Sequence, residues 1–345
     1  MTKRKVLIIY TGGTIGMVKD YETKALRAFD FSKISERIPE LNHLDCHIQT
    51  ESFENVIDSS NVSLMDMVKI GTIIFENFDS FDGFVVLTGS DTMAYISSTL
   101  SFMLENLSKP VIFTGSQLPI GDLRTDAKES LITAIQVASA YKDNLPIVSE
   151  VCLYFEYKLY RANRTSKVNA EHFEAFTSPN YPPLAESGVH LNFNTHLLHR
   201  SKESDAPLIL RTNLNPNVFV LKLFPGMGKD VLEHVFSIPG LRAIVMETYG
   251  AGNAPSESWF TSVLSKAIDS GIKIVNITQC NAGSVIQGHY ETSLALQEMG
   301  VIEGRDLTTE AALAKLMYLL ALEDQLENFK SVFETPLRGE MTAGD

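Results

Sequence analysis

The sequence has few cysteines and no long apolar run. Its 345 residues include only Cys46, Cys152 and Cys280, whose spacing fits neither a disulfide framework nor a metal-binding pair. No apolar stretch approaches the length of a membrane span, and the first one, Val6 to Tyr10, is too short for the apolar core of a signal peptide. These absences argue against a disulfide-rich secreted domain and favour a cytoplasmic protein with no membrane contact.

Positive charge is also scarce. The chain has 29 Lys and Arg against 42 Asp and Glu, which gives a formal net charge of −13. A surface of this sign repels polyanions, so nucleic acid is not an expected partner. The apolar content of 44% is ample for two hydrophobic cores, and the length of 345 residues fits two globular domains.

The motifs of several common enzyme classes are missing as well. The eight histidines lie outside the glycine-rich loops, so Ser-His-Asp catalysis is not expected. Neither HExxH nor facial-triad spacing occurs, and we predict no metal and no cofactor. The loop TGGTIG at Thr11–Gly16 lacks the lysine of a Walker loop, and its spacing weakens a dinucleotide-binding interpretation without excluding it.

The sequence does contain a repeated pattern of short apolar runs that end in glycine, hydroxyl and amide residues. The runs are VLIIYTGGT, FVVLTGSDT, VIFTGSQLP and, more weakly, IVNITQCNAG. Continuous apolar strands of this kind are typical of a parallel sheet that is covered on both faces. Apolar spacing in DTMAYISSTLSFMLENL and SLITAIQVASAY predicts helices between the strands, so the fold class is α/β.

We predict two α/β domains. The larger N-terminal domain, residues 1–187, contains the parallel sheet, and its pattern ends near the proline-rich stretch SPNYPPLAESG. The less periodic segment 188–213 is predicted to be a linker. A smaller Rossmann-like C-terminal domain, residues 214–345, is predicted from VFVLKLFP, AIVMETYGAGNAP, KIVNITQCNAGS and the helical pattern TEAALAKLMYLLAL.

Hydroxyl and carboxylate side chains are expected to gather at one edge of the N-terminal sheet. Ligands of such a sheet bind beyond the C-terminal ends of its strands. The residues expected there are Thr14, Asp58, Ser59, Ser60, Ser90 and Asp91. Hydroxyls, carboxylates and backbone donors together suit a small polar zwitterion better than a phosphate. Backbone N–H groups around Gly12, Gly13 and Gly89 would stabilise an oxyanion, by about 2.7–4 kcal/mol per donor.

A hydroxyl nucleophile needs a neighbouring base. Because these loops contain no histidine, we consider a lysine, whose ammonium loses its proton more easily when partly buried. Lys167, in LYRANRTSKVNAEHF, is the candidate. The spacing of residues does not distinguish Lys167 from the other lysines. Taken alone, the segment LYRANRTSKVNAEHF resembles a solvated basic loop.

Five motifs of this chain occur together in one known family. The stretches YTGGTIGM, DSSN, LTGSDTMAYISSTLSFMLENLSKPVIFTGSQLP, LYRANRTSK and ETYGAGNAP resemble, in this order, the cytoplasmic type I bacterial L-asparaginases. The likeness extends from Val6 to the C-terminal stretch LRGEMT. The resemblance implies hydrolysis of L-asparagine to L-aspartate and ammonia by a homodimer or homotetramer.

The resemblance also implies catalytic roles. Thr14 matches the first nucleophile of the family, which forms an acyl-enzyme with the side-chain carbonyl group of asparagine. Lys167 matches the lysine that activates a second hydroxyl, which here belongs to Ser90. Asp91 matches the acid that holds the α-ammonium group of the substrate.

Further residues are implied to bind the substrate. Asp58, Ser59 and Ser60 match the segment that binds the α-carboxylate region. Asn253 resembles a residue that is contributed across a dimer interface. The alternative is that Asn253 only caps the helix that follows Pro255.

Two positions depart from the family pattern. Ser90 stands where the family usually has a second threonine, so the hydroxyl is kept but a methyl group that limits its rotamers is lost. We expect slower turnover as a result. The family also has a tyrosine in the loop after TGGTIG; the nearest phenol here is Tyr21, in VKDYETKALRAFDF, and its catalytic role stays open.

Two other functions remain alternatives at this point. One is an amino-acid-binding regulatory module that kept the pocket and lost the chemistry, which a test for ammonia release from L-asparagine would separate. The other is the asparaginase-like subunit of a tRNA-dependent amidotransferase, against which the acidic charge argues. Asparagine and glutamine both stay candidate substrates, since one methylene is worth only about 1–3 kcal/mol in a pocket.

Overall fold

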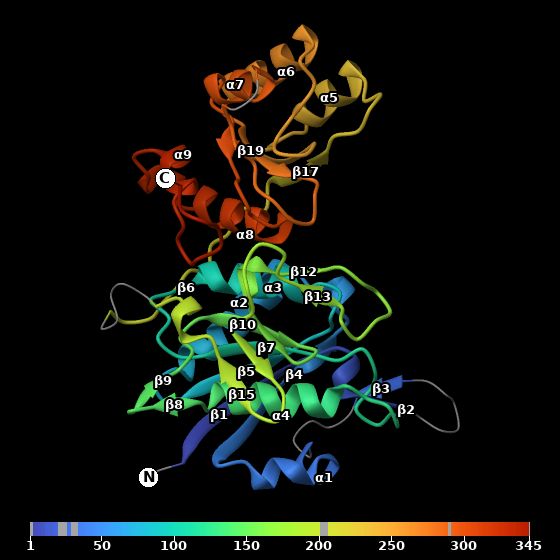
Figure 1. Ribbon diagram of the computed structural model, residues 1–345, viewed down its shortest axis with the longest axis vertical. Helices are drawn as coiled ribbons and strands as arrows, with labels where there is room; N and C mark the ends of the chain where they lie inside the picture. The colour runs from blue at the N-terminus through green and yellow to red at the C-terminus, as the bar shows by residue number, and fades with distance from the viewer. Residues whose placement is uncertain (1–2, 20–25, 29–33, 201–205, 289–290, 345) are drawn as a thin grey trace. The chain divides into compact units, whose positions relative to one another are not determined.

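The structure is a computed structural model that describes residues 3–19, 26–28, 34–200, 206–288 and 291–344. The chain forms two compact units, Met1–Thr212 (unit 1) and Asn213–Asp345 (unit 2), and each is described by itself. Figure 1 shows their helices and strands.

Unit 1 is built around a mixed sheet. Its described residues form eight strands in the spatial order β15-β14-β11-β10-β7-β5-β1-β4. The five strands β4, β1, β5, β7 and β10 are parallel, which confirms the parallel sheet predicted from the apolar runs, and β11, β14 and β15 extend it in antiparallel fashion. The bounds are β1 (Arg4–Gly12), β4 (Cys46–Ile57), β5 (Gly83–Leu87), β7 (Val111–Thr114), β10 (Val151–Phe155), β11 (Lys158–Arg161), β14 (Ala185–Ser187) and β15 (Leu191–Phe193).

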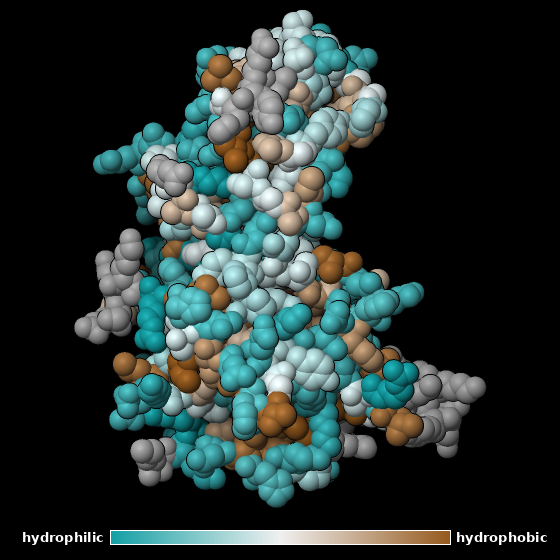
Figure 2. All heavy atoms as spheres, in the orientation of Figure 1, coloured by the Kyte–Doolittle hydropathy of each residue, from teal (hydrophilic) through white to brown (hydrophobic). Residues whose placement is uncertain are grey.

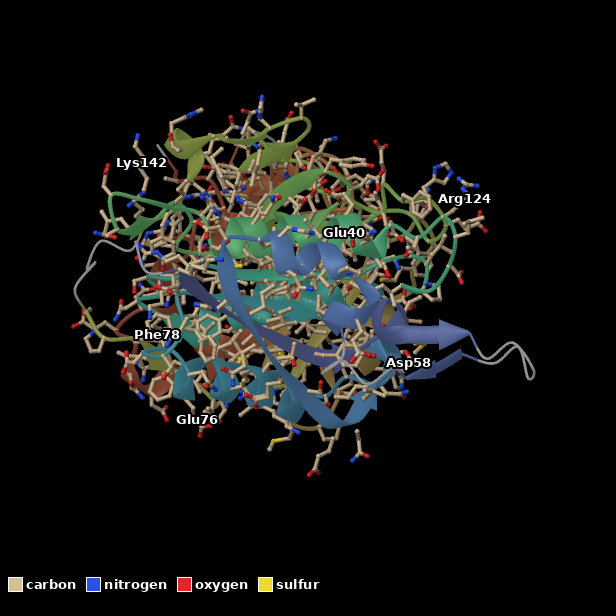
Figure 3. All side chains as sticks on the ribbon, turned by 90° about the horizontal axis from the view of Figure 1, so that it is seen from below. Glu40, Asp58, Glu76, Phe78, Arg124 and Lys142 are labelled. Atoms are coloured by element: carbon tan, nitrogen blue, oxygen red, sulfur yellow. The ribbon has the colours of Figure 1, made fainter. Side chains whose placement is uncertain are left out.

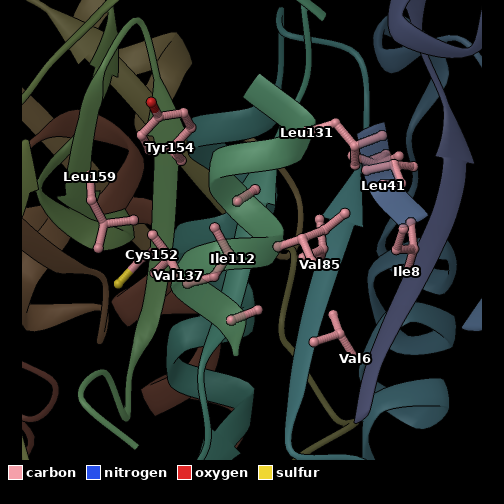
Figure 4. Close-up of a cluster of buried hydrophobic side chains, with 14 of the residues drawn as sticks. Val6, Ile8, Leu41, Val85, Ile112, Leu131, Val137, Cys152, Tyr154 and Leu159 are labelled. Carbon is pink, nitrogen blue, oxygen red and sulfur yellow. The ribbon is translucent and has the colours of Figure 1, made fainter. Parts of the chain in front are cut away.

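Helices cover both faces of this sheet. Figure 1 shows α2 (Leu64–Glu76) and α3 (Met93–Met103) on one face and α4 (Ala127–Ala138) on the other. Leu131 and Val137 of α4 belong to the same buried cluster as Val85 and Ile112 of the central strands (Figure 4). Because both faces are covered, the central strands are apolar throughout rather than alternating.

Shorter elements complete unit 1. They are α1 (Ile34–Arg37), β2 (Met17–Lys19) paired with β3 (Leu26–Ala28), β6 (Leu104–Glu105) with β16 (Ile209–Leu210), β8 (Tyr141–Lys142) with β9 (Leu145–Pro146), and β12 (Ser166–Lys167) with β13 (Phe176–Thr177). The segment 188–213, predicted as a linker, carries β15 and β16, which pair with other strands of unit 1. Leu191 and Phe193 pack against the core, and this apolar contact holds the segment to the sheet.

Unit 2 contains a smaller parallel sheet, as predicted. Its described strands follow the order β17-β18-β19-β20. They are β17 (Val218–Lys222), β18 (Ala243–Thr248), β19 (Lys273–Thr278) and β20 (Ile302–Glu303). The helices are α5 (Lys229–Phe236), α6 (Ser258–Asp269), α7 (Glu291–Glu298), α8 (Thr309–Leu320) and α9 (Phe329–Phe333).

A buried ion pair ties the end of the chain to α8. Lys315 Nζ lies 2.5 Å from Glu340 Oε1, and both side chains are 0% exposed. The same ammonium donates a hydrogen bond to the Thr335 carbonyl oxygen at 2.7 Å. Glu340 also accepts hydrogen bonds from the backbone N–H groups of Leu337 and Arg338. These contacts satisfy two charges that would otherwise be costly to bury.

We expect Lys315→Met to lower the free energy of unfolding by about 3–5 kcal/mol, because it leaves a buried carboxylate without its counter-ion. Trp259 is the single tryptophan of the chain and lies on α6, so its fluorescence during urea denaturation reports on unit 2. Adding Glu340→Gln is expected to recover part of the loss, since a neutral amide needs no counter-ion. A Lys315→Met protein as stable as the parent would contradict this account.

The surface is mainly polar. Figure 2 shows hydrophilic residues over much of the face in view, with separate hydrophobic patches between them. Over the described ranges, no helix has the length and apolar character needed to cross a membrane.

Candidate active site

The loops after three neighbouring strands of unit 1 meet at one edge of the sheet. β1 pairs in parallel with both β4 and β5, so the residues that follow these strands emerge side by side. The loops lie so close together that side chains on the two glycines would clash. A Cβ atom on Gly13 would lie only 2.4 Å from the Gly89 nitrogen, and a Cβ atom on Gly89 only 2.5 Å from Ser59 Oγ. Gly13 also has a φ of 87°, which favours glycine. The glycines therefore allow the predicted hydroxyl-bearing loops to approach one another closely.

Thr14 begins a short 3₁₀ helix, η1 (Thr14–Gly16), directly after Gly13. Its side chain is half-buried, whereas the next residue, Ile15, is fully buried. Ile15 thus anchors the turn while Thr14 stays accessible from the sheet edge. Tyr21 lies outside the described residues.

Ser90, Asp91 and Lys167 come together although they belong to distant parts of the chain. Lys167 Nζ donates a hydrogen bond to Ser90 Oγ at 2.9 Å and lies 2.6 Å from Asp91 Oδ1. The Lys167 side chain is 15% exposed and that of Asp91 is 70% exposed. A shielded lysine therefore contacts a hydroxyl on one side, while the carboxylate beside it remains open to a ligand.

Asp58, Ser59 and Ser60 form the next part of the site. Asp58 follows the last residue of β4 and caps η4 (Ser59–Asn61) (Figure 3). It accepts hydrogen bonds from the backbone N–H group of Ser60 at 3.0 Å and from the Ser60 hydroxyl at 2.9 Å, and these bonds lower the pKa of the Asp58 carboxyl group. Ser59 is buried against Gly89. The carboxylate is thus ionised and fixed at the sheet edge.

The Lys167 segment is held by packing against α3, the helix that follows Asp91. The turn η5 (Ala162–Arg164) is buried, and Asn163 Nδ2 donates to Ser101 Oγ of α3 at 3.1 Å. Ser98 of α3 donates to the Ala162 carbonyl oxygen at 3.3 Å. The basic stretch LYRANRTSK is therefore not the solvated loop that spacing alone favoured.

A second buried ion pair lies at the start of the segment that leads to Lys167. Arg161 Nε lies 2.6 Å from Glu150 Oε2, and the two side chains are 4% and 6% exposed. The Arg161 guanidinium also lies 4.4 Å from the centre of the Tyr181 ring. These contacts fix the strand β11 from which the segment leading to Lys167 emerges.

Asn253 belongs to unit 2. It follows β18 in a tight loop that is closed by two backbone hydrogen bonds with Tyr249, at 2.9 and 2.8 Å. The helix α6 begins at Ser258, with Glu257 in the capping position. The alternative role of Asn253 as the cap of this helix is therefore wrong.

Two residues of the site were missed by reasoning from the sequence. Thr92 Oγ1 donates to the Ser59 carbonyl oxygen at 2.8 Å and so links the loops after β4 and β5. Gln117, in the stretch TGSQLP, accepts a hydrogen bond from Ser90 Oγ at 3.3 Å. The position of Gln117 just after the apolar run of β7 was the available signal, because all such positions share one sheet edge.

Hydroxyl, lysine and carboxylate side chains gathered at one edge can carry nucleophilic and acid–base chemistry on a small polar substrate. Within the part of the chain that the structure describes, no group of three or more His, Cys, Asp or Glu side chains is placed to hold a metal ion.

Known proteins resemble this chain in both sequence and architecture. The family model "Asparaginase, N-terminal" matches residues 5–199, and "Glutaminase/Asparaginase C-terminal domain" matches residues 217–333. L-asparaginase 1 of Escherichia coli K12 is 40% identical over 347 residues, with 100% of both chains covered. The crystal structure of L-asparaginase I from Vibrio cholerae is 38% identical and has a TM-score of 0.88, with 99% of each chain covered.

A third relative carries a different description. It is a glutamyl-tRNA(Gln) amidotransferase component from Sulfolobus acidocaldarius, which is 35% identical and aligns with 99% of this chain and 76% of its own length. The family models match both units, and the relatives cover the chain from end to end. The chain therefore belongs to the asparaginase family.

Proposed function

We propose that this chain is an L-asparaginase, which hydrolyses the side-chain amide of L-asparagine to give L-aspartate and ammonia. The observation that carries the proposal is the contact of Lys167 Nζ with Ser90 Oγ and Asp91 Oδ1. It joins a base, a hydroxyl and a carboxylate beside the Thr14 loop, the combination that amide hydrolysis by a hydroxyl nucleophile requires. The L-asparaginases among the relatives agree with this substrate.

The proposed reaction has two stages. Thr14 Oγ1 attacks the amide carbon of the substrate, the C–N bond breaks, and ammonia leaves with the proton that Thr14 loses. Water then attacks the resulting ester, which releases L-aspartate and returns the proton to Thr14. Ser90 relays the proton between the reacting groups, and Lys167 serves as the base that takes it up and returns it, to the departing nitrogen in the first stage and to Thr14 in the second.

The charged ends of the substrate have separate anchors in this proposal. The open carboxylate of Asp91 holds the α-ammonium group. The segment of Asp58, Ser59 and Ser60 holds the α-carboxylate region, and the Ser60 hydroxyl, which donates to Asp58 in the structure, turns to the α-carboxylate when the substrate binds. Such fixed contacts keep the amide carbon near Thr14, which lowers the entropic part of the barrier.

The experiment is an assay of ammonia release by the purified chain with L-asparagine, L-glutamine and D-asparagine. We expect ammonia and L-aspartate in equal amounts from L-asparagine, and the rate of ammonia release from L-glutamine decides which of the two amides is preferred. A folded chain that releases no ammonia from any of them would reject the proposal and leave a binding module.

A second candidate function is that of an amidotransferase component, which the likeness to the Sulfolobus acidocaldarius protein favours. Such a component works together with a partner that binds tRNA. The net charge of −13 disfavours the binding of nucleic acid to the surface of this chain as a whole. Rapid ammonia release by the isolated chain, unchanged by added tRNA, would support the hydrolase. Release only with tRNA and a partner would support the amidotransferase role.

We also propose a cytoplasmic location. Cys46, Cys152 and Cys280 are free thiols, of which Cys46 and Cys152 are buried and Cys280 is exposed. Free thiols of this kind suit a reducing compartment.

We propose that Asn253 completes the site of a neighbouring chain in a homodimer or homotetramer. If so, mixing inactive Thr14→Ala chains with weakened Asn253→Ala chains should restore part of the hydrolytic activity. Random pairing would make half of the dimers mixed, each with one intact site, so about one quarter of the original activity should return. Light scattering at assay concentration measures the oligomeric state. Full activity in a monomeric preparation, or mixed dimers without recovery, would reject the shared site.

A further inference from the structure

Ser90 Oγ lies between two polar partners. Lys167 Nζ donates to it at 2.9 Å, and it donates to Gln117 Oε1 at 3.3 Å. Both Ser90 and Gln117 are partly buried. The hydroxyl is therefore held on two sides, by the lysine and by an amide oxygen.

Gln117 is itself fixed at both its side chain and its backbone. Its Nε2 group donates to the carbonyl oxygen of His172 at 2.9 Å. Because a carbonyl oxygen only accepts, this bond determines that Oε1 is the amide atom that faces Ser90. The backbone N–H group of Gln117 donates to Asp126 Oδ2 at 2.8 Å, so the loop after β7 is anchored as well.

The contacts form a closed ring. Lys167 and His172 belong to one segment, and the chain of hydrogen bonds runs from Lys167 through Ser90 and Gln117 back to His172. Asn169 stabilises the turn between them by accepting hydrogen bonds from the backbone N–H groups of Glu171 and His172. The ring thus links the loops after β5 and β7 to the segment that carries Lys167.

Ser90 needs such a support more than a threonine would. A serine side chain has three staggered rotamers open to it, whereas the β-branched threonine is restricted at χ1. The Gln117 contact favours the rotamer that places Oγ near Lys167. At 3.3 Å it is longer than the usual O–H···O distance of about 2.7–2.8 Å, and it directs the Ser90 proton toward Gln117, so an Oγ lone pair faces the donating Lys167 Nζ.

We propose that Gln117 is a positioning residue that holds the Ser90 hydroxyl in the rotamer facing Lys167, and so compensates for the methyl group that this chain lacks at position 90. The inference rests on the proposed hydrolase function. It assigns to Gln117 an effect on turnover rather than on substrate binding.

The test compares four proteins: the original chain, Gln117→Met, Ser90→Thr, and the double variant. Methionine has nearly the length of glutamine but neither amide group. With serine at position 90, Gln117→Met is expected to lower kcat about tenfold, the loss expected for one hydrogen bond, with little change in KM. With threonine at this position, the same change should cost less than about twofold, because the γ-methyl group already restricts the rotamer.

A matched control is Gln136→Met, the same substitution on the exposed side of α4, which should leave kcat unchanged. Equal losses in the serine and threonine backgrounds would show that Gln117 only supports the loop, and would overturn the inference. So would an effect confined to KM.

Crystal structures of the original chain and Gln117→Met give a readout that does not depend on activity. We expect a single Ser90 rotamer in the first and several in the second. If the original chain releases no ammonia from asparagine, the proposed hydrolase function fails, while the Ser90 rotamers still decide the positioning role. An unchanged single rotamer in Gln117→Met would refute that role.

Discussion

Thr14→Ala should reduce kcat/KM for L-asparagine by at least about 10⁴-fold, because the nucleophile of the proposed acyl-enzyme is lost and no other group forms the ester. Thr14 is only half-buried, so the fold should be retained and the melting temperature nearly unchanged. The measurement is ammonia release at saturating and subsaturating asparagine, with the circular dichroism spectrum as a check on folding.

Two further variants show whether the hydroxyl itself is responsible. Thr14→Val keeps the shape of the side chain without the oxygen and should be as inactive as Thr14→Ala. Thr14→Ser keeps the hydroxyl and should retain measurable turnover. Mass spectrometry of a rapidly quenched reaction should find an aspartyl ester on the peptide that contains Thr14. Normal hydrolysis by folded Thr14→Ala would rule out this nucleophile.

Replacement of Lys167 by methionine is the second change with a large expected effect. Its ammonium group contacts both Ser90 and Asp91, so Lys167→Met removes the base and the ion pair together. We expect kcat to fall by about 10²–10⁴-fold, the usual contribution of a general base. The fold should survive, since Asp91 is 70% exposed and can be solvated when its partner is lost.

The control is Lys142→Met, which removes an exposed lysine of β8 in the same unit and should not alter turnover. Small primary amines added to Lys167→Ala should restore part of the activity if the missing group is a base. A loss of less than tenfold in Lys167→Met, without rescue by amines, would show that Lys167 only supports the loop.

The local elements of this protein could be predicted from its sequence. Continuous apolar runs predicted β1, β5 and β7, because a strand that is buried on both faces carries apolar side chains at nearly every position. The glycine and hydroxyl residues at the ends of these runs predicted where Thr14 and Ser90 would lie, since parallel strands end at a common edge. Those signals are contained within short stretches of chain.

The antiparallel extension of the sheet could not be predicted in the same way. β14 and β15 are three residues each. β14 pairs with the free edge of β11 and β15 pairs with β14, so neither strand can form until β11 is in place. Leu191 and Phe193 carry too short a pattern to identify a strand until the core against which they pack exists. The segment was therefore predicted as a linker.

By itself, the sequence determined the apolar parallel strands, the helices with clear hydrophobic periodicity and the residue types available at the sheet edge, because backbone preference and hydrophobic periodicity act over a few residues. Only the tertiary structure decided which side chains meet. Lys167 and Ser90 are 77 positions apart, and their contact depends on the packing of η5 against α3 and on the buried pair of Arg161 with Glu150. The contact between Gln117 and Ser90 also depends on the tertiary structure, because a hydrogen bond forms only when folding has already brought both partners within about 3 Å.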